Sequence, residues 1–181
     1  MSETLIEETL ESVRAEKLTA AGTAWGERIT ANTASAALTF KASGTSTGSV
    51  SSEITAGKHR FIVDEPEALA GDDVAASPVE FALGALISCQ VVVYRLYAHQ
   101  LGIKIDSLDI NADADLDVRG LFGIEKSVRP GFGEVRLTVK IDGPETRERY
   151  EKLQAAVDEH CPVLDVFTNP TPVSVELVTA D

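Results

Sequence analysis

The fold is decided by residues 78–101, which read PVEFALGALISCQVVVYRLYAHQL. Pro78 is preorganised for the first position of a helix, and Ser77 before it can cap that helix. Gly102 stands where such a helix would stop, so the stretch predicts one helix of about 24 residues, or about 36 Å. Apolar side chains cover nearly every face of its first half, and a helix that is apolar all round is buried all round. We therefore expect it to run through the middle of the molecule or between two subunits.

Two strands are predicted after this helix, at residues 106–118 and 135–141, because apolar residues occupy every second position in both. Each strand has one face for a core and one for water, and we expect the two to pair as an antiparallel hairpin. A second helix is predicted from Pro144 to about Cys161, because Pro162 disfavours a helical residue before it.

The ends of the chain complete the pattern. Residues 1–17 predict a helix capped by Ser2, and residues 20–33 predict an irregular connector. Short strands are predicted at 36–42, 49–55 and 59–63, a loop at 64–76 and a closing strand at 173–177. This order of elements predicts an α+β fold. We expect an N-terminal helix and connector over 1–33 and one main domain over 34–181.

Composition excludes several kinds of partner. The chain has 181 residues and a formal net charge of −13, which disfavours nucleic acid and anionic membranes as partners. The N-terminus is charged and lacks the apolar core of a signal peptide. Gln90 and Arg95 interrupt the longest apolar stretch, so no membrane span is predicted. We expect a cytoplasmic protein, in a compartment where thiols rest reduced.

The two cysteines, Cys89 and Cys161, allow three interpretations: two buried thiols, one structural disulfide, or one redox pair. A reducing compartment disfavours the structural disulfide. Cys89 lies in the middle of the apolar helix, where a free cysteine often serves as a small buried hydrophobe. Cys161 lies at a helix end before a proline, which is less typical of core filler. Buried thiols and a redox pair both remain open from the residues alone.

An ordered set of motifs resembles the OsmC/Ohr superfamily of osmotically induced and organic hydroperoxide resistance proteins. The motifs are Asp64-Glu65-Pro66, Ser77-Pro78-Val79-Glu80, Ser88-Cys89, Gly131-Phe132 and Cys161-Pro162-Val163. The resemblance runs from about Thr39 to Val178 and leaves the N-terminal helix outside. It implies an OsmC-like fold, with antiparallel sheets wrapped around long central helices in an intertwined homodimer.

The resemblance also implies a chemistry. Cys89 would be the thiolate that attacks an organic hydroperoxide and becomes a sulfenic acid, and Cys161 would resolve it as a disulfide that an external dithiol reduces. In the hydroperoxide branch of the family, an arginine and a glutamate support the thiolate. Here Val79 follows the proline and no arginine lies in residues 43–49, so Glu80 and Arg60 are the candidates for those two roles.

A simpler interpretation exists for each candidate. Glu80 is also an acid in a first helical turn, and it is half a turn out of phase with Cys89. Arg60 is also an ordinary solvent-facing strand residue. The alternative function is therefore a non-enzymatic OsmC-like protein that binds a small apolar or thiol-containing ligand at the dimer interface.

No cofactor or metal is predicted. The acids on the first long strand are best explained as a solvated face rather than a calcium site; they are Asp109, Asp113, Asp115 and Asp117. His160 and the two cysteines lack the local spacing of a zinc site.

Overall fold

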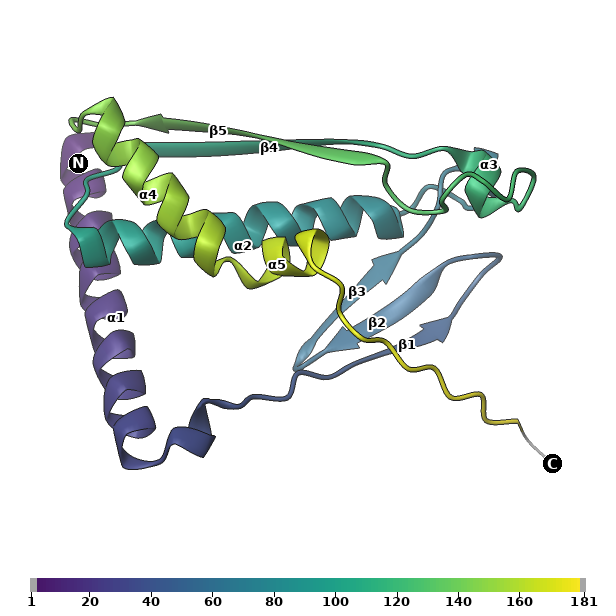
Figure 1. Ribbon diagram of the computed structural model, residues 1–181, viewed down its shortest axis with the longest axis horizontal. Coiled ribbons are helices and arrows are strands. Elements are labelled where there is room, and N and C mark those ends of the chain that lie inside the picture. The colour runs from purple at the N-terminus through teal and green to yellow at the C-terminus, as the bar shows by residue number, and fades with distance from the viewer. Residues whose placement is uncertain (1–2, 180–181) are drawn as a thin grey trace. The chain divides into compact units, whose positions relative to one another are not determined.

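The computed structural model in Figure 1 describes the backbone of residues 3–179 and the side chains of residues 10–179. The chain divides into two compact units, Met1–Ala82 and Leu83–Asp181. The first unit contains a long helix and a three-stranded sheet, and the second contains a β-hairpin and most of the remaining helices. Helices and antiparallel sheets are thus combined as the α+β prediction requires.

The N-terminal helix is longer than expected. Helix α1 covers Glu3–Ala31, followed by a short 3-10 helix, η1, at Thr33–Ala36. The connector predicted at 20–33 is therefore wrong. Residues 20–31 contain several alanines and no proline, a composition that favours a helix although the residues show no helical periodicity. The predicted cap, Ser2, lies outside the described residues.

Three short antiparallel strands form the sheet of the first unit: β1 (Ala42–Ser46), β2 (Ser52–Ala56) and β3 (His59–Val63). The third strand matches its prediction, the second starts three residues late, and the strand expected at 36–42 is wrong. The turn lies at 47–51, where the backbone N–H of Thr47 donates to the carbonyl of Ser51 at 2.8 Å. Gly44 fits within β1 because the Ile54 side chain from β2 fills the space beside it.

The loop at 64–76 is tied together by one buried carboxylate. Asp64 is 2% exposed, and its Oδ2 accepts hydrogen bonds from the backbone N–H groups of Asp72 (3.0 Å) and Val74 (3.2 Å). A backbone hydrogen bond from Glu65, together with these two, lowers the pKa of the Asp64 carboxyl. The loop, which includes the 3-10 helix η2 at Glu67–Leu69, therefore has a fixed path into the next helix.

Helix α2 covers Pro78–Leu101, the bounds that the sequence predicts. Glu80 Oε2 accepts hydrogen bonds from the backbone N–H and the hydroxyl of Ser77, both at 2.7 Å, and the Ser77 hydroxyl accepts from the Glu80 N–H at 3.4 Å. This reciprocal arrangement is a capping box. It explains why the helix starts where it does.

One face of α2 is not buried, contrary to the expectation of burial all round. The inner face is formed by Leu86, Gln90, Val93, Tyr94 and Ala98. On the other side, Val92 is 62% exposed. The helix is long and apolar enough to cross a membrane by length and composition alone, a test that core helices of soluble proteins also pass.

The second unit contains the predicted hairpin. Strands β4 (Ser107–Asp115) and β5 (Glu134–Asp142) pair antiparallel, with Leu108 opposite Ile141 and Ile110 opposite Val139. The short helix α3 (Val118–Leu121) lies in the connection between the strands. Exposed and half-buried positions alternate along both strands, which confirms the predicted two-faced pattern.

Helix α4 follows at Arg147–His160 and α5 at Pro162–Thr168. The first begins three residues after Pro144, because Thr146 provides the side-chain cap by accepting from the Arg149 N–H. Its end at His160 agrees with the prediction. Helix α5, which begins at Pro162 directly after Cys161, is not among the elements that the sequence predicts.

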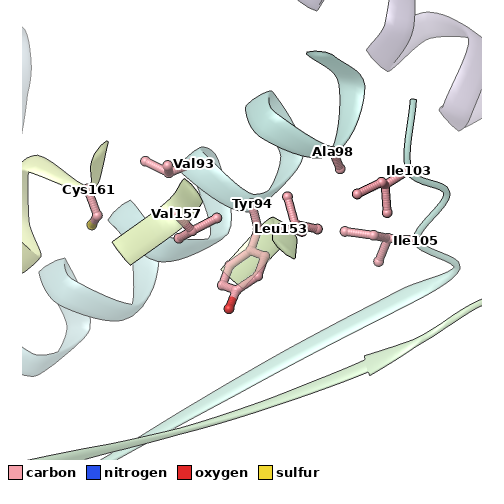
Figure 2. Packing of buried hydrophobic residues seen from close by; sticks show 8 residues of the cluster. All are labelled: Val93, Tyr94, Ala98, Ile103, Ile105, Leu153, Val157 and Cys161. Carbon is pink, nitrogen blue, oxygen red and sulfur yellow. The ribbon is translucent and has the colours of Figure 1, made fainter. Parts of the chain in front are cut away.

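The core of the second unit joins α2 to α4 and the hairpin. Figure 2 shows Leu153 and Val157 from α4 beside Tyr94 from α2, with Cys161 at one end of the cluster and Ile103 and Ile105 at the other. Half-buried residues of the hairpin pack against this cluster; they are Leu108, Ile110, Val139 and Ile141. The core therefore fixes the helix that carries Cys89 against the chain segment that carries Cys161.

The closing strand predicted at 173–177 does not form. Residues 170–179 have no assigned helix or strand, and Val173, Val175 and Leu177 are between 82% and 91% exposed. An apolar segment with alternating pattern becomes a strand only where a neighbouring strand supplies hydrogen bonds. Within the described residues of this chain, no strand pairs with it.

Candidate thiol site

The two cysteines lie on different elements of the second unit. Cys89 is half-buried in the middle of α2, and Cys161 is 2% exposed at the junction between α4 and α5. Both are free thiols. Cys89 packs against the buried cluster to which Cys161 belongs, so the fold brings together two thiols that lie 72 positions apart in the sequence.

The surroundings of Cys89 act on its pKa in both directions. Burial raises it most, and the adjacent Cys161 thiol raises it further, through a hydrogen bond and through repulsion between the two sulfurs when ionised. The backbone N–H of Val163 opposes these effects by donating to the Cys89 sulfur. The net direction is upward, so the thiolate of Cys89 is disfavoured in this arrangement.

Val163 is a site residue that sequence reasoning missed. Pro162 occupies the first position of α5 and Val163 follows it, so the N–H of Val163 belongs to the first helical turn, where backbone donors have no partner within the helix. The sequence contains an indication of this donor, because a proline that ends one helix is also well suited to begin the next.

Gln90, one of the polar residues that interrupt the apolar sequence of α2, has no role in the predicted site. Its side chain is 1% exposed, and its Nε2 has no hydrogen-bond partner among the described residues. A buried donor without a partner costs about 1–3 kcal/mol. Gln90 follows Cys89 directly in α2, so an unpaired amide nitrogen belongs to the residue next to the thiol in sequence.

Glu80 and Arg60, the predicted carboxylate and arginine, each have a local partner. Glu80 holds Ser77 in the capping box, and these hydrogen bonds lower the pKa of its carboxyl. It lies nine positions before Cys89 on an unbroken helix, about 13.5 Å along the axis. Arg60, on β3, faces Glu53 at 3.9 Å with both side chains largely exposed. The structure therefore gives both residues the simpler roles and does not test the catalytic ones.

The contacts of His160 are with protein groups of its own surroundings. Its Nδ1 donates to the carbonyl of Ala156 at 2.8 Å, and its ring lies against Tyr97 with centroids 4.7 Å apart. Within residues 3–179, no group of three or more histidine, cysteine or acidic side chains is arranged to hold a metal ion.

The comparisons with known proteins agree with the geometry of this fold. The family profile "OsmC-like protein" matches residues 71–176, more than half of the chain. The chain therefore belongs to the OsmC-like family. No curated protein matches the sequence.

Several solved structures share the fold. An OsmC-like protein from Mycoplasma pneumoniae superposes with a TM-score of 0.62 at 17% identity, covering 72% of this chain and 87% of that one. An organic hydroperoxide resistance protein from Elizabethkingia anophelis gives 0.57 at 24% identity, covering 73% and 89%. One from Legionella pneumophila gives 0.57 at 19%, covering 72% and 90%. These superpositions confirm the OsmC-like fold. At such low sequence identity they are evidence for the fold alone.

Proposed function

We propose that the protein is a cytoplasmic, cysteine-dependent peroxidase that reduces organic hydroperoxides. The observation that carries the proposal is the contact between the Cys89 and Cys161 thiols, at the edge of a core that fixes both helices. A pair of thiols in contact can pass between dithiol and disulfide without a large movement of the backbone. Two solved relatives named for organic hydroperoxide resistance support the choice of oxidant.

The proposed cycle has three balanced steps. The Cys89 thiolate attacks the terminal oxygen of the hydroperoxide; the O–O bond breaks, the alkoxide leaves and takes a proton as the alcohol, and Cys89 becomes a sulfenic acid. The Cys161 thiol attacks that sulfenic sulfur, forming the disulfide and releasing water. An external dithiol then reduces the disulfide by exchange and is itself oxidised to a disulfide.

The first step needs help, because burial favours the protonated thiol of Cys89. The Val163 N–H supplies one favourable interaction. We assign the remaining support to Arg60, as the guanidinium that stabilises the thiolate, and to Glu80, as the carboxylate that orients it. The capping box of Glu80 would then serve catalysis as well, since it fixes the start of the helix that carries the thiol.

We further propose that the working form is the homodimer expected from the family fold. The exposed face of α2 supports this proposal. It carries small and apolar residues at one-face spacing: Ala85, Ser88 and Val92. Such a surface allows two helices to pack closely.

The test follows consumption of cumene hydroperoxide with excess dithiothreitol. We expect Cys89→Ser to reduce the rate by about a hundredfold or more, because the nucleophile is lost. In a separate experiment without dithiothreitol, Cys161→Ser should consume one equivalent of hydroperoxide and leave a sulfenic acid on Cys89, trapped by dimedone and seen by mass spectrometry. Arg60→Ala should slow the first step about tenfold or more.

Arg147→Ala is the matched control for Arg60→Ala, because Arg147 is also exposed and paired, with Glu151 at 2.7 Å. It should leave the rate unchanged. If Cys89→Ser is as fast as the wild type, the protein is not a peroxidase of this kind. The non-enzymatic binding of an apolar or thiol-containing ligand then becomes the better account.

A further inference from the structure

A cavity lies at the connection between β4 and β5, lined by none of the thiol-site residues. Its volume is about 310 Å³, at the lower end of the range for small-molecule sites. The lining residues all come from the end of β4 and from the 116–133 connection: Asp115, Leu116, Asp117, Val128, Arg129, Gly131 and Gly133. Figure 1 shows α3, which belongs to the same connection, at the end of the hairpin.

Both acidic residues of the cavity are neutralised by arginines. Asp115 accepts two hydrogen bonds from Arg136, at 2.5 and 3.2 Å. Asp117 accepts from the Nε of Arg119 at 3.0 Å and from its Nη2 at 2.5 Å. These hydrogen bonds lower the pKa of both carboxyls, that of Asp117 to about 2, so the two pairs remain ionised at neutral pH.

Arg129 also lines the cavity, and it takes part in neither of these ion pairs. Among the residues that the structure describes, its guanidinium has no hydrogen bond and no ion pair. It extends past Gly131, where an added Cβ would lie 3.6 Å from Nη2. A guanidinium carries five donors in a planar fork, which matches a carboxylate.

Backbone contacts hold the chain segment around Arg129 in place. An added Cβ at Gly120 would lie 2.5 Å from the Arg129 carbonyl oxygen, so α3 packs directly on this part of the chain. The N–H of Ile124 donates to the backbone carbonyl of Arg119 at 2.9 Å. The N–H of Gly133 donates to the backbone carbonyl of Asp115 at 2.8 Å. The cavity is therefore bounded by a connection with internal hydrogen bonds.

We infer that this cavity binds a small monocarboxylate with an apolar chain. The Arg129 guanidinium would take the carboxylate in a bidentate pair, and Leu116 and Val128 would contact the chain. The volume holds about ten water molecules at ~30 Å³ each, which suits a ligand the size of octanoate. The site and its ligand are independent of peroxide chemistry at the cysteines.

The test is titration of the purified protein with octanoate by calorimetry, with amide chemical shifts followed in parallel. We expect saturable binding that perturbs the amides of Leu116, Val128 and Gly131. Arg129→Ala should weaken binding at least tenfold, and Arg129→Lys should retain part of the affinity. Octanol, with the same chain and no carboxylate, should bind at least tenfold more weakly than octanoate.

Lys126→Ala is the matched control, because Lys126 carries the same charge on the same connection but does not line the cavity. It should bind octanoate as the wild type does. Unchanged thermal midpoints in the variants ensure that folding is not the cause. Absence of octanoate binding, equal binding by Arg129→Ala, or shift changes confined to other regions would each overturn the inference. None of these results depends on the peroxidase assay.

Discussion

At the residue scale, the proposed peroxidase chemistry depends on the environment of one sulfur, that of Cys89. Burial and the neighbouring Cys161 thiol keep it protonated, whereas the Val163 N–H favours its ionised form. A raised pKa in the folded state means that the protonated thiol stabilises the fold. That contribution is complete below the pKa of the unfolded thiol, about 8.5, and is lost as pH rises through the folded value.

Replacing Cys161 tests this balance. Cys161→Ala removes both the hydrogen bond and the charge repulsion that raise the pKa of Cys89, so that pKa should fall. The pH dependence of alkylation of Cys89 by iodoacetamide, followed by mass spectrometry, measures the change. Val166→Ala, at an exposed position of α5, should leave the profile in place. A Cys89 profile unchanged or shifted to higher pH in Cys161→Ala contradicts this account.

Sequence reasoning at this scale identified the cysteines but not what surrounds them. Their positions follow from motifs and from the helix pattern, whereas the Val163 donor and the orphan amide of Gln90 depend on how distant segments pack. For Glu80, the sequence left both a first-turn acid and a catalytic carboxylate open, and the structure shows its carboxylate in a capping box with Ser77. The sequence does not indicate that Arg129 is unpaired, because the presence or absence of a partner depends on the three-dimensional fold.

At the element scale, backbone chemistry sets where elements begin and end. Pro78, Ser77 and Gly102 define α2, and strict alternation defines the hairpin, so the sequence predicts these elements well. It fails for α1 beyond residue 19, where small residues carry no periodic signal although they favour helix. It also fails at 173–177, where the sequence alternates but no strand within residues 3–179 pairs with the segment.

The loop before α2 offers a test of its own. An added Cβ at Gly71 would collide with the backbone of Glu65, including its carbonyl group, and backbone cannot move aside cheaply. We expect Gly71→Ala to destabilise the fold by about 1–3 kcal/mol. Urea unfolding followed by circular dichroism measures the difference.

Gly22→Ala is the control for that substitution. Gly22 lies within α1 with no atom near an added Cβ, so alanine should be neutral or stabilising by up to about 1 kcal/mol. Equal stability of Gly71→Ala and the wild type would show that the loop relaxes to accept a side chain.

At the scale of the whole molecule, the single chain leaves apolar surface uncovered. Val92 on α2 and the segment at 173–178 are two examples among several, and an exposed apolar surface of some extent is typical of an interaction site. The expectation that α2 is buried on all sides is wrong for one chain. It becomes right in the proposed homodimer, where a second copy of α2 covers the free face.

This proposal predicts the effect of a charge on that face. Val92→Glu should shift the sedimentation coefficient from dimer to monomer, because a carboxylate cannot be buried against an apolar helix without a large penalty. Val74→Glu is the matched control, since Val74 is 67% exposed and lies in the 64–76 loop. A Val92→Glu protein that sediments like the wild type would rule out α2 as the dimer contact.

The uncovered C-terminal segment has a consequence for how the protein assembles. Residues 173–178 combine β-prone sequence with low charge, the composition of segments that pair promiscuously between chains. If the proposed homodimer forms, a newly folded chain carries this segment exposed until it meets a second copy, so productive assembly is bimolecular and competes with aggregation. Refolding yield should therefore pass through an optimum in protein concentration: too dilute a solution delays the encounter, and too concentrated a solution favours disordered association.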